Sequence, residues 1–128
     1  MKTLTLIVLL FTSQFAHATL SSAEQRCLLL STYHEARSLS ETDWLKVASV
    51  ATNRKEFYEK YGFGSASSNL CDIVKSKQYT SHKLLNKHIR EPRVLSKMRK
   101  VLQSKRIKTK YLFFTSHNGT MHYKRNFR

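Results

Sequence analysis

The chain has 128 residues, and its 23 lysines and arginines against 8 aspartates and glutamates give a formal net charge of +15. This length allows one compact domain and excludes an array of several domains. A field this positive attracts polyanions, whether nucleic acid, anionic lipid surfaces or anionic cell-wall polymers, and charge alone does not choose among them.

The first 18 residues have the pattern of a secretory leader. One lysine precedes an apolar stretch, and the segment ends in Ala16-His17-Ala18, which is a small-x-small cleavage pattern. The apolar part is too short to span a bilayer, and the small residues at its end disfavour the alternative, an uncleaved anchor. We therefore predict a Sec-type signal peptide at 1–18, a single domain at 19–128, and a periplasmic or extracellular protein.

Two capping-box patterns predict the first two helices of the mature chain. They are SSAE at residues 21–24 and SETD at residues 40–43. The first helix is expected to run to Arg37. The second is expected to run to about Lys60, because apolar residues recur along it at helical spacing.

The second half of the chain predicts shorter elements. Two glycines in residues 61–69 indicate a loop, and a short helix is expected around Cys71. Pro92 suits the first turn of a further helix, in which a core-facing apolar stripe lies opposite lysines and arginines. The aromatic and β-branched tail is expected to form an extended segment or a hairpin. The predicted fold class is therefore mainly α, with a short irregular or β element near the C-terminus.

Cys27 and Cys71 are the only cysteines. In an exported protein, two cysteines pair more often than they stay free, although two separate buried thiols are the alternative. A bridge that closes so long a loop contributes on the order of 4 kcal/mol in the chain-entropy model.

Metal and nucleophile chemistry have little support in the sequence. His34 and Glu35 begin like the HExxH motif, but Ser38 stands where the second metal-binding histidine is required. His117 and His122 are too loosely spaced to indicate a metal site, and no nucleophile-elbow pattern marks a catalytic serine. We expect neither a metal nor another cofactor.

Glu35 remains as the candidate catalytic residue. A carboxylate near the C-terminal end of a helix feels the negative end of the helix dipole, and partial burial also raises its pKa. Both effects favour the protonated form, which a general acid requires. From periodicity alone, the alternative is a surface salt bridge with Arg37 or another basic residue.

Three blocks of the sequence resemble one family. Residues 27–54, CLLLSTYHEARSLSETDWLKVASVATNR, resemble the SleB-type cell wall hydrolases, which include spore-cortex-lytic and phage-associated peptidoglycan enzymes. The family patterns Tyr-x-Glu-Ala-Arg and Val-x-Asn-Arg occur here at the same distances. NLCDIVKSKQYTS at 69–81 and NGTMHY at 118–123 resemble two later family segments, so the resemblance spans nearly the whole mature domain.

This resemblance implies a lysozyme-like, mostly helical α+β fold. It also implies an enzyme that cleaves the glycan strand between N-acetylmuramic acid and N-acetylglucosamine. It implies that Glu35 is the catalytic acid, and it strengthens the pairing of Cys27 with Cys71. Core packing is the competing interpretation for the tyrosines and the histidine among the implied substrate-binding residues. These are Tyr33, Arg37, Gln78, Tyr79, His122 and Tyr123.

The chain also departs from the family pattern. Ser38 and Leu39 replace the usual glycine and second glutamate, Met121 replaces a threonine, and Asp43 replaces a glycine before the second helix. Glycoside cleavage usually requires two carboxylates, and only Glu35 stands in a recognisable setting.

The family's resemblance to lytic transglycosylases implies a route that needs one carboxylate. In that route the C6 hydroxyl of the muramic sugar is the nucleophile, and we favour it over attack by water. Asp72 and Glu91 are the remaining candidates for a second carboxylate.

The expected partners are the peptidoglycan substrate and anionic envelope surfaces, with no nucleic acid and a monomeric state. Two rival functions remain. A non-catalytic cationic envelope-binding module would explain the altered Ser38, Leu39 and Met121. A secreted basic nuclease would use the histidines at positions 34, 117 or 122 as acid and base.

Overall fold

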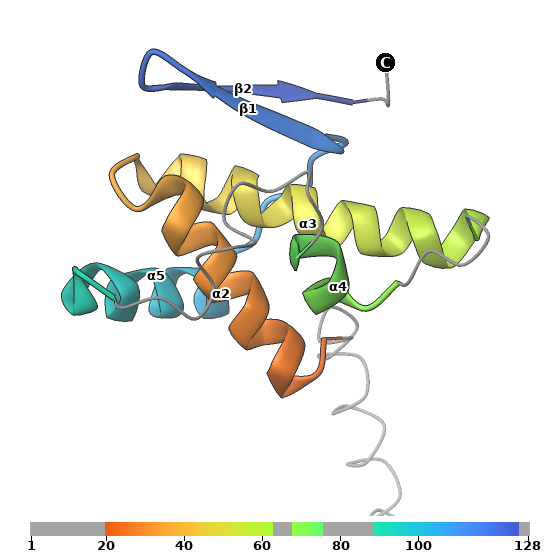
Figure 1. Ribbon diagram of the computed structural model, residues 1–128, viewed down its shortest axis with the longest axis horizontal. Helices are drawn as coiled ribbons and strands as arrows, with labels where there is room; N and C mark the ends of the chain where they lie inside the picture. Colours follow the sequence, from red (N-terminus) through yellow and green to blue (C-terminus); the bar gives the residue numbers. More distant parts are fainter. Residues whose placement is uncertain (1–19, 63–67, 76–88, 126–128) are drawn as a thin grey trace, which may run out of the picture.

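The computed structural model describes residues 20–62, 68–75 and 89–125 (Figure 1). The predicted signal peptide lies outside these ranges, as do the predicted groove residues Gln78 and Tyr79.

Four helices and one hairpin make up this part of the chain, so the mainly α prediction with a short C-terminal β element is confirmed. In Figure 1, α2 crosses α3 while the hairpin lies over α3, and α2 packs against α3, α4 and α5. In the ranges described, no helix is both long and apolar enough to cross a bilayer. The elements are α2 (Ser22–Ala36), α3 (Glu41–Tyr61), α4 (Leu70–Lys75), α5 (Pro92–Ser104), β1 (Phe113–His117) and β2 (Thr120–Lys124).

Side-chain caps start the two long helices where the sequence predicts. At α2, the Ser21 hydroxyl accepts the Glu24 N–H at 3.1 Å, and the Ser21 N–H donates to Glu24 Oε1 at 3.1 Å. At α3, the Ser40 hydroxyl accepts the Asp43 N–H at 3.3 Å and donates to Asp43 Oδ2 at 3.1 Å. α3 ends at Gly62, whose φ of 58° lies in the left-handed region that favours glycine.

The helices bury two apolar clusters. The larger cluster joins α2 and α3 to α5 and β2, and it contains Leu29, Tyr33, Ala36, Trp44, Val47, Met98, Val101 and Met121. The smaller cluster lies where α4 packs against α2 and α3, and it contains Leu30, Ala51, Leu70, Ile73 and Val74. The predicted stripe of α5 faces this core, with Met98 fully buried.

The tail forms the hairpin that the sequence left as one of two options. Its two-residue turn is Asn118-Gly119, and both residues have positive φ, at 51° and 75°. An Asn-Gly pair is favoured in such turns because the right-handed twist of the strands requires this backbone. Two residues of α3 donate hydrogen bonds to the segment that leads into β1. The Asn53 amide donates to the Tyr111 carbonyl at 3.0 Å, and Arg54 Nε donates to the Leu112 carbonyl.

Candidate functional site

The last turn of α2, Tyr33 to Ala36, is where distant segments of the chain meet. Trp44 at the start of α3 donates its indole N–H to the Ala36 carbonyl at 2.7 Å. The Tyr33 hydroxyl accepts the backbone N–H of Glu91, just before α5, at 2.9 Å. Met121 of β2 packs in the same cluster as Tyr33 and Ala36. The first and third blocks of the sequence resemblance therefore come together at this end of α2.

Glu35 is half-buried in this turn. The adjacent His34 has a lowered pKa, because burial and the positive charge of Arg37 outweigh the opposite effect of Glu35. His34 is thus neutral at neutral pH and adds no positive charge beside Glu35. Its Nε2 atom is buried and accepts no hydrogen bond from the residues described.

Arg37 caps α2 and forms an ion pair with Glu91. Its Nε lies 3.0 Å from Glu91 Oε2, and its guanidinium carbon lies 5.6 Å from the centroid of the Tyr33 ring. The pair ties the end of α2 to the start of α5. Glu91, a candidate second carboxylate, is therefore engaged by Arg37, whereas Asp72 is exposed on α4.

Tyr33 is only 1% exposed, so its ring is part of the core and not of the solvent-facing surface. This is the packing interpretation that competed with a sugar contact. Through its hydroxyl and ring, Tyr33 instead positions Glu91 and Arg37.

Tyr123 links β2 to the start of α3. Its hydroxyl donates to Asp43 Oδ1 at 2.7 Å, and its ring stacks on Tyr111 with 5.1 Å between the ring centroids. Burial raises the pKa of the Tyr123 hydroxyl, and the hydrogen bond and negative charge of Asp43 raise it further. Asp43 departs from the family pattern, and it is the hydrogen-bond acceptor of Tyr123, which matches that pattern.

His122 does not join Tyr123 at this place. Successive residues of a strand point to opposite faces, and Met121 and Tyr123 contact the larger cluster while His122 is exposed. Its ring centroid lies 6.5 Å from that of His117, which is also exposed. Within the ranges described, no group of three or more histidines, cysteines, aspartates or glutamates is arranged to hold a metal ion.

Two of the departures from the family pattern serve packing. Met121 is 9% exposed within the larger cluster, and Leu39 is half-buried against it. An apolar side chain at position 39 extends the core, so no carboxylate is available at the place of the family's second glutamate.

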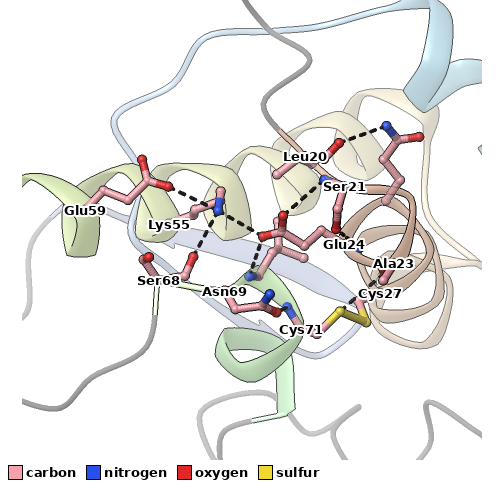
Figure 2. Close-up of polar contacts among 12 residues, drawn as sticks. Leu20, Ser21, Ala23, Glu24, Cys27, Lys55, Glu59, Ser68, Asn69 and Cys71 are labelled. Atoms are coloured by element: carbon pink, nitrogen blue, oxygen red, sulfur yellow. Dashed lines mark hydrogen bonds and ion pairs between the residues drawn. A yellow bond between two sulfur atoms is a disulfide. The ribbon is translucent and has the colours of Figure 1, made fainter.

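A buried charge network lies near the opposite end of α2 (Figure 2). Glu24 Oε2 accepts the Leu70 N–H at 2.8 Å and lies 2.9 Å from Lys55 Nζ, which also approaches Glu59 at 3.1 Å. Burial alone would raise the pKa of Glu24, but the hydrogen bonds from Leu70, Lys55 and Ser21 lower it to about 2. The sequence indicated Glu24 only as a capping residue, because its partners Lys55 and Leu70 are distant in the chain.

The Cys27–Cys71 disulfide lies beside this network and joins α2 to α4, with 5.3 Å between the Cα atoms (Figure 2). It brings the second block of the resemblance against the first. The alternative of two separate buried thiols is excluded.

No family model, curated protein or solved structure matches this chain. The SleB-type resemblance therefore depends on the residues quoted above. The lysozyme-like fold that it implies remains an expectation.

Proposed function

We propose that the protein is an exported peptidoglycan-cleaving glycosidase that acts as a lytic transglycosylase, with Glu35 as its acid and base. The observation that carries the proposal is the meeting of the matched sequence blocks around the turn that holds Glu35. Tyr33 and Trp44 belong to the first block and Met121 to the third, and all three pack in one cluster.

The chemistry needs one carboxylic acid. Glu35 donates its proton to the glycosidic oxygen as the bond from C1 of the muramic sugar to that oxygen breaks, and the leaving sugar gains a hydroxyl. The resulting carboxylate then takes the proton of the C6 hydroxyl, and O6 bonds to C1 to close a 1,6-anhydro ring. Glu35 thus regains the proton that it loses. The reaction consumes no water and needs no second carboxylate.

The surroundings of Glu35 support this route over hydrolysis. Leu39 extends the core at the position of the family's second glutamate, and Glu91 is paired with Arg37 at 3.0 Å. Position 39 therefore has no carboxylate, and the carboxylate of Glu91 is held by Arg37. In this proposal Arg37 and Tyr33 position the end of α2, and Tyr123 positions the start of α3. Gln78, Tyr79 and the exposed His122 stay proposed sugar contacts.

Replacing the carboxyl of Glu35 by an amide tests the proposal. Glu35→Gln removes the transferable proton at nearly constant size, and we expect glycan cleavage to fall by about 10²- to 10⁴-fold. Glu56→Gln is the matched control, because Glu56 is an exposed glutamate of α3 and should keep full activity. The measurement is clearing of purified peptidoglycan in a gel, with circular dichroism to show that both variants fold.

A non-catalytic cationic envelope-binding module is the second candidate. The packing roles of Leu39 and Met121 favour it, because they replace residues that the family resemblance associates with the site. It predicts that the wild type binds peptidoglycan without clearing it. Equal clearing by the wild type and Glu35→Gln would exclude Glu35 as the acid and base, and clearing by neither would exclude the enzymatic proposal.

A further inference from the structure

The outward side of α5 and the segment that follows it are rich in exposed lysines and arginines. We call this surface the basic face. It consists of exposed lysines and arginines and includes no acidic residue; its members are Arg93, Lys97, Arg99, Lys100, Lys105, Arg106, Lys108 and Lys110.

Among the basic residues of α5 itself, only Lys97 has an ion pair with another described residue. Glu41 lies 3.8 Å from Lys97 and 3.7 Å from Lys105, and it serves both. Arg93, Arg99 and Lys100 have no ion pair within the parts of the chain that the structure describes. Like charges held this close on one helix repel one another. A bound polyanion would reduce this repulsion.

The apolar side of α5 is already used in the core. Met98 and Val101 are buried in the larger cluster, and Val94, Leu95 and Leu102 pack against it. The helix therefore has no free apolar face to insert into a bilayer. Any partner of the basic face must be held by charge and not by buried apolar area.

We propose that the basic face docks the protein on an anionic phospholipid surface. Lysines outnumber arginines on it, and a lysine ammonium is a strongly hydrated point charge that suits a diffuse layer of phosphates. Single-stranded nucleic acid, by contrast, is usually held by aromatic side chains that stack on bases, and α5 has no aromatic residue. The choice of a lipid surface rests on the export that the proposed function includes.

Docking by this face would also orient the protein. α5 begins beside the last turn of α2, where Glu91 contacts Arg37 and Tyr33. In the view of Figure 1, the first turns of α5 lie on the opposite side of α2 from α4. A membrane bound to the first turns of α5 would therefore lie close to the end of α2 that carries Glu35. It would lie farther from α4.

The test compares two triple variants with the same change in net charge. Arg93→Gln, Arg99→Gln and Lys100→Gln together remove charge from the basic face. The control combines Arg26→Gln, Lys60→Gln and Lys75→Gln, at exposed positions on α2, α3 and α4. Unfolding temperatures establish that both variants fold.

The measurement is co-sedimentation with vesicles of phosphatidylcholine alone or mixed with phosphatidylglycerol. We expect binding only to the mixed vesicles, abolished near 1 M salt, where the screening length is about 3 Å. The basic-face variant should bind on the order of a hundredfold more weakly at low salt, since each basic residue near the surface contributes about fivefold. The control variant should bind within about tenfold of the wild type.

Three results would overturn the proposal. These are equal binding to neutral vesicles, equal loss in the two triple variants, or tighter binding to a DNA duplex at the same phosphate concentration with the same dependence on α5. The assay is independent of catalysis. Glu35→Gln should bind vesicles like the wild type, so failure of docking and failure of the enzymatic proposal give different results.

Discussion

At the scale of single residues, Glu24 shows how a buried charge is tolerated in a small core. The residue is 5% exposed, and an isolated carboxylate at such a place would be costly. Here Ser21, Leu70 and Lys55 all donate to it, so the charged form is favoured and its pKa falls to about 2. One side chain thereby caps α2 and binds α3 and α4.

This lowered pKa predicts an acid-sensitive fold. A carboxyl whose pKa is lower in the folded protein contributes stability above its unfolded value of 4.5, and the contribution is lost as the pH falls towards about 2. The shift corresponds to about 3 kcal/mol. We expect Glu24→Gln to lower the free energy of unfolding at pH 7 by about this amount, measured by urea denaturation.

The same variant should also flatten the pH dependence between pH 4.5 and pH 2. Glu56→Gln, an exposed glutamate of α3, is the control and should keep the wild-type slope. The assignment of Glu24 would be wrong if Glu24→Gln lost stability in acid as steeply as the wild type.

At the scale of elements, local signals predicted most of the fold. The caps at Ser21 and Ser40 and the proline at the start of α5 each act over a few residues, and each lies where the sequence analysis predicts. The Asn118-Gly119 turn is an equally local signal, but the sequence analysis left the tail open between an extended segment and a hairpin. The contacts between elements could not be predicted in this way. The Tyr123–Asp43 hydrogen bond joins residues far apart in the chain, and no local pattern specifies it.

The candidate site could be predicted only in part for the same reason. Tyr33 and Arg37 are four residues apart at the end of α2, so their contact follows from helical geometry, and Glu35 lies between them in the chain. The face of β2 that His122 occupies depends on the hairpin register, in which His122 lies opposite Thr115 and Met121 opposite Ser116. The sequence left that register open, and His122 proved to be on the exposed face.

The disulfide is expected to stabilise the short helix α4. α4 has only 6 residues, too few for an isolated helix to be stable in water, so it depends on tertiary contacts and on its link to α2. The cysteines are 44 residues apart, and opening this loop should cost about 4 kcal/mol.

We therefore expect the double variant Cys27→Ser, Cys71→Ser to unfold at a much lower urea concentration than the wild type. The wild type under reducing conditions should match the variant. An unchanged midpoint in both cases would show that the bridge adds no stability.

At the scale of the whole molecule, the apolar core and the surface charge have different proposed roles. The larger cluster brings α2, α3, α5 and β2 together around the turn that holds Glu35. The net charge of +15 is concentrated partly on the basic face, on the outward side of one of these helices. In our proposals, the first arrangement provides the acid for glycan cleavage and the second brings the protein to its surface.

Mass spectrometry of the fragments released from purified peptidoglycan is the most direct test of the central proposal. We predict fragments with 1,6-anhydro muramic ends, each lighter by one water than the corresponding hydrolysis product, and their yield from Glu35→Gln should be lower by about 10²- to 10⁴-fold. Fragments with reducing ends would contradict the intramolecular route, and the absence of any fragment from a folded wild-type protein would contradict the enzymatic function itself.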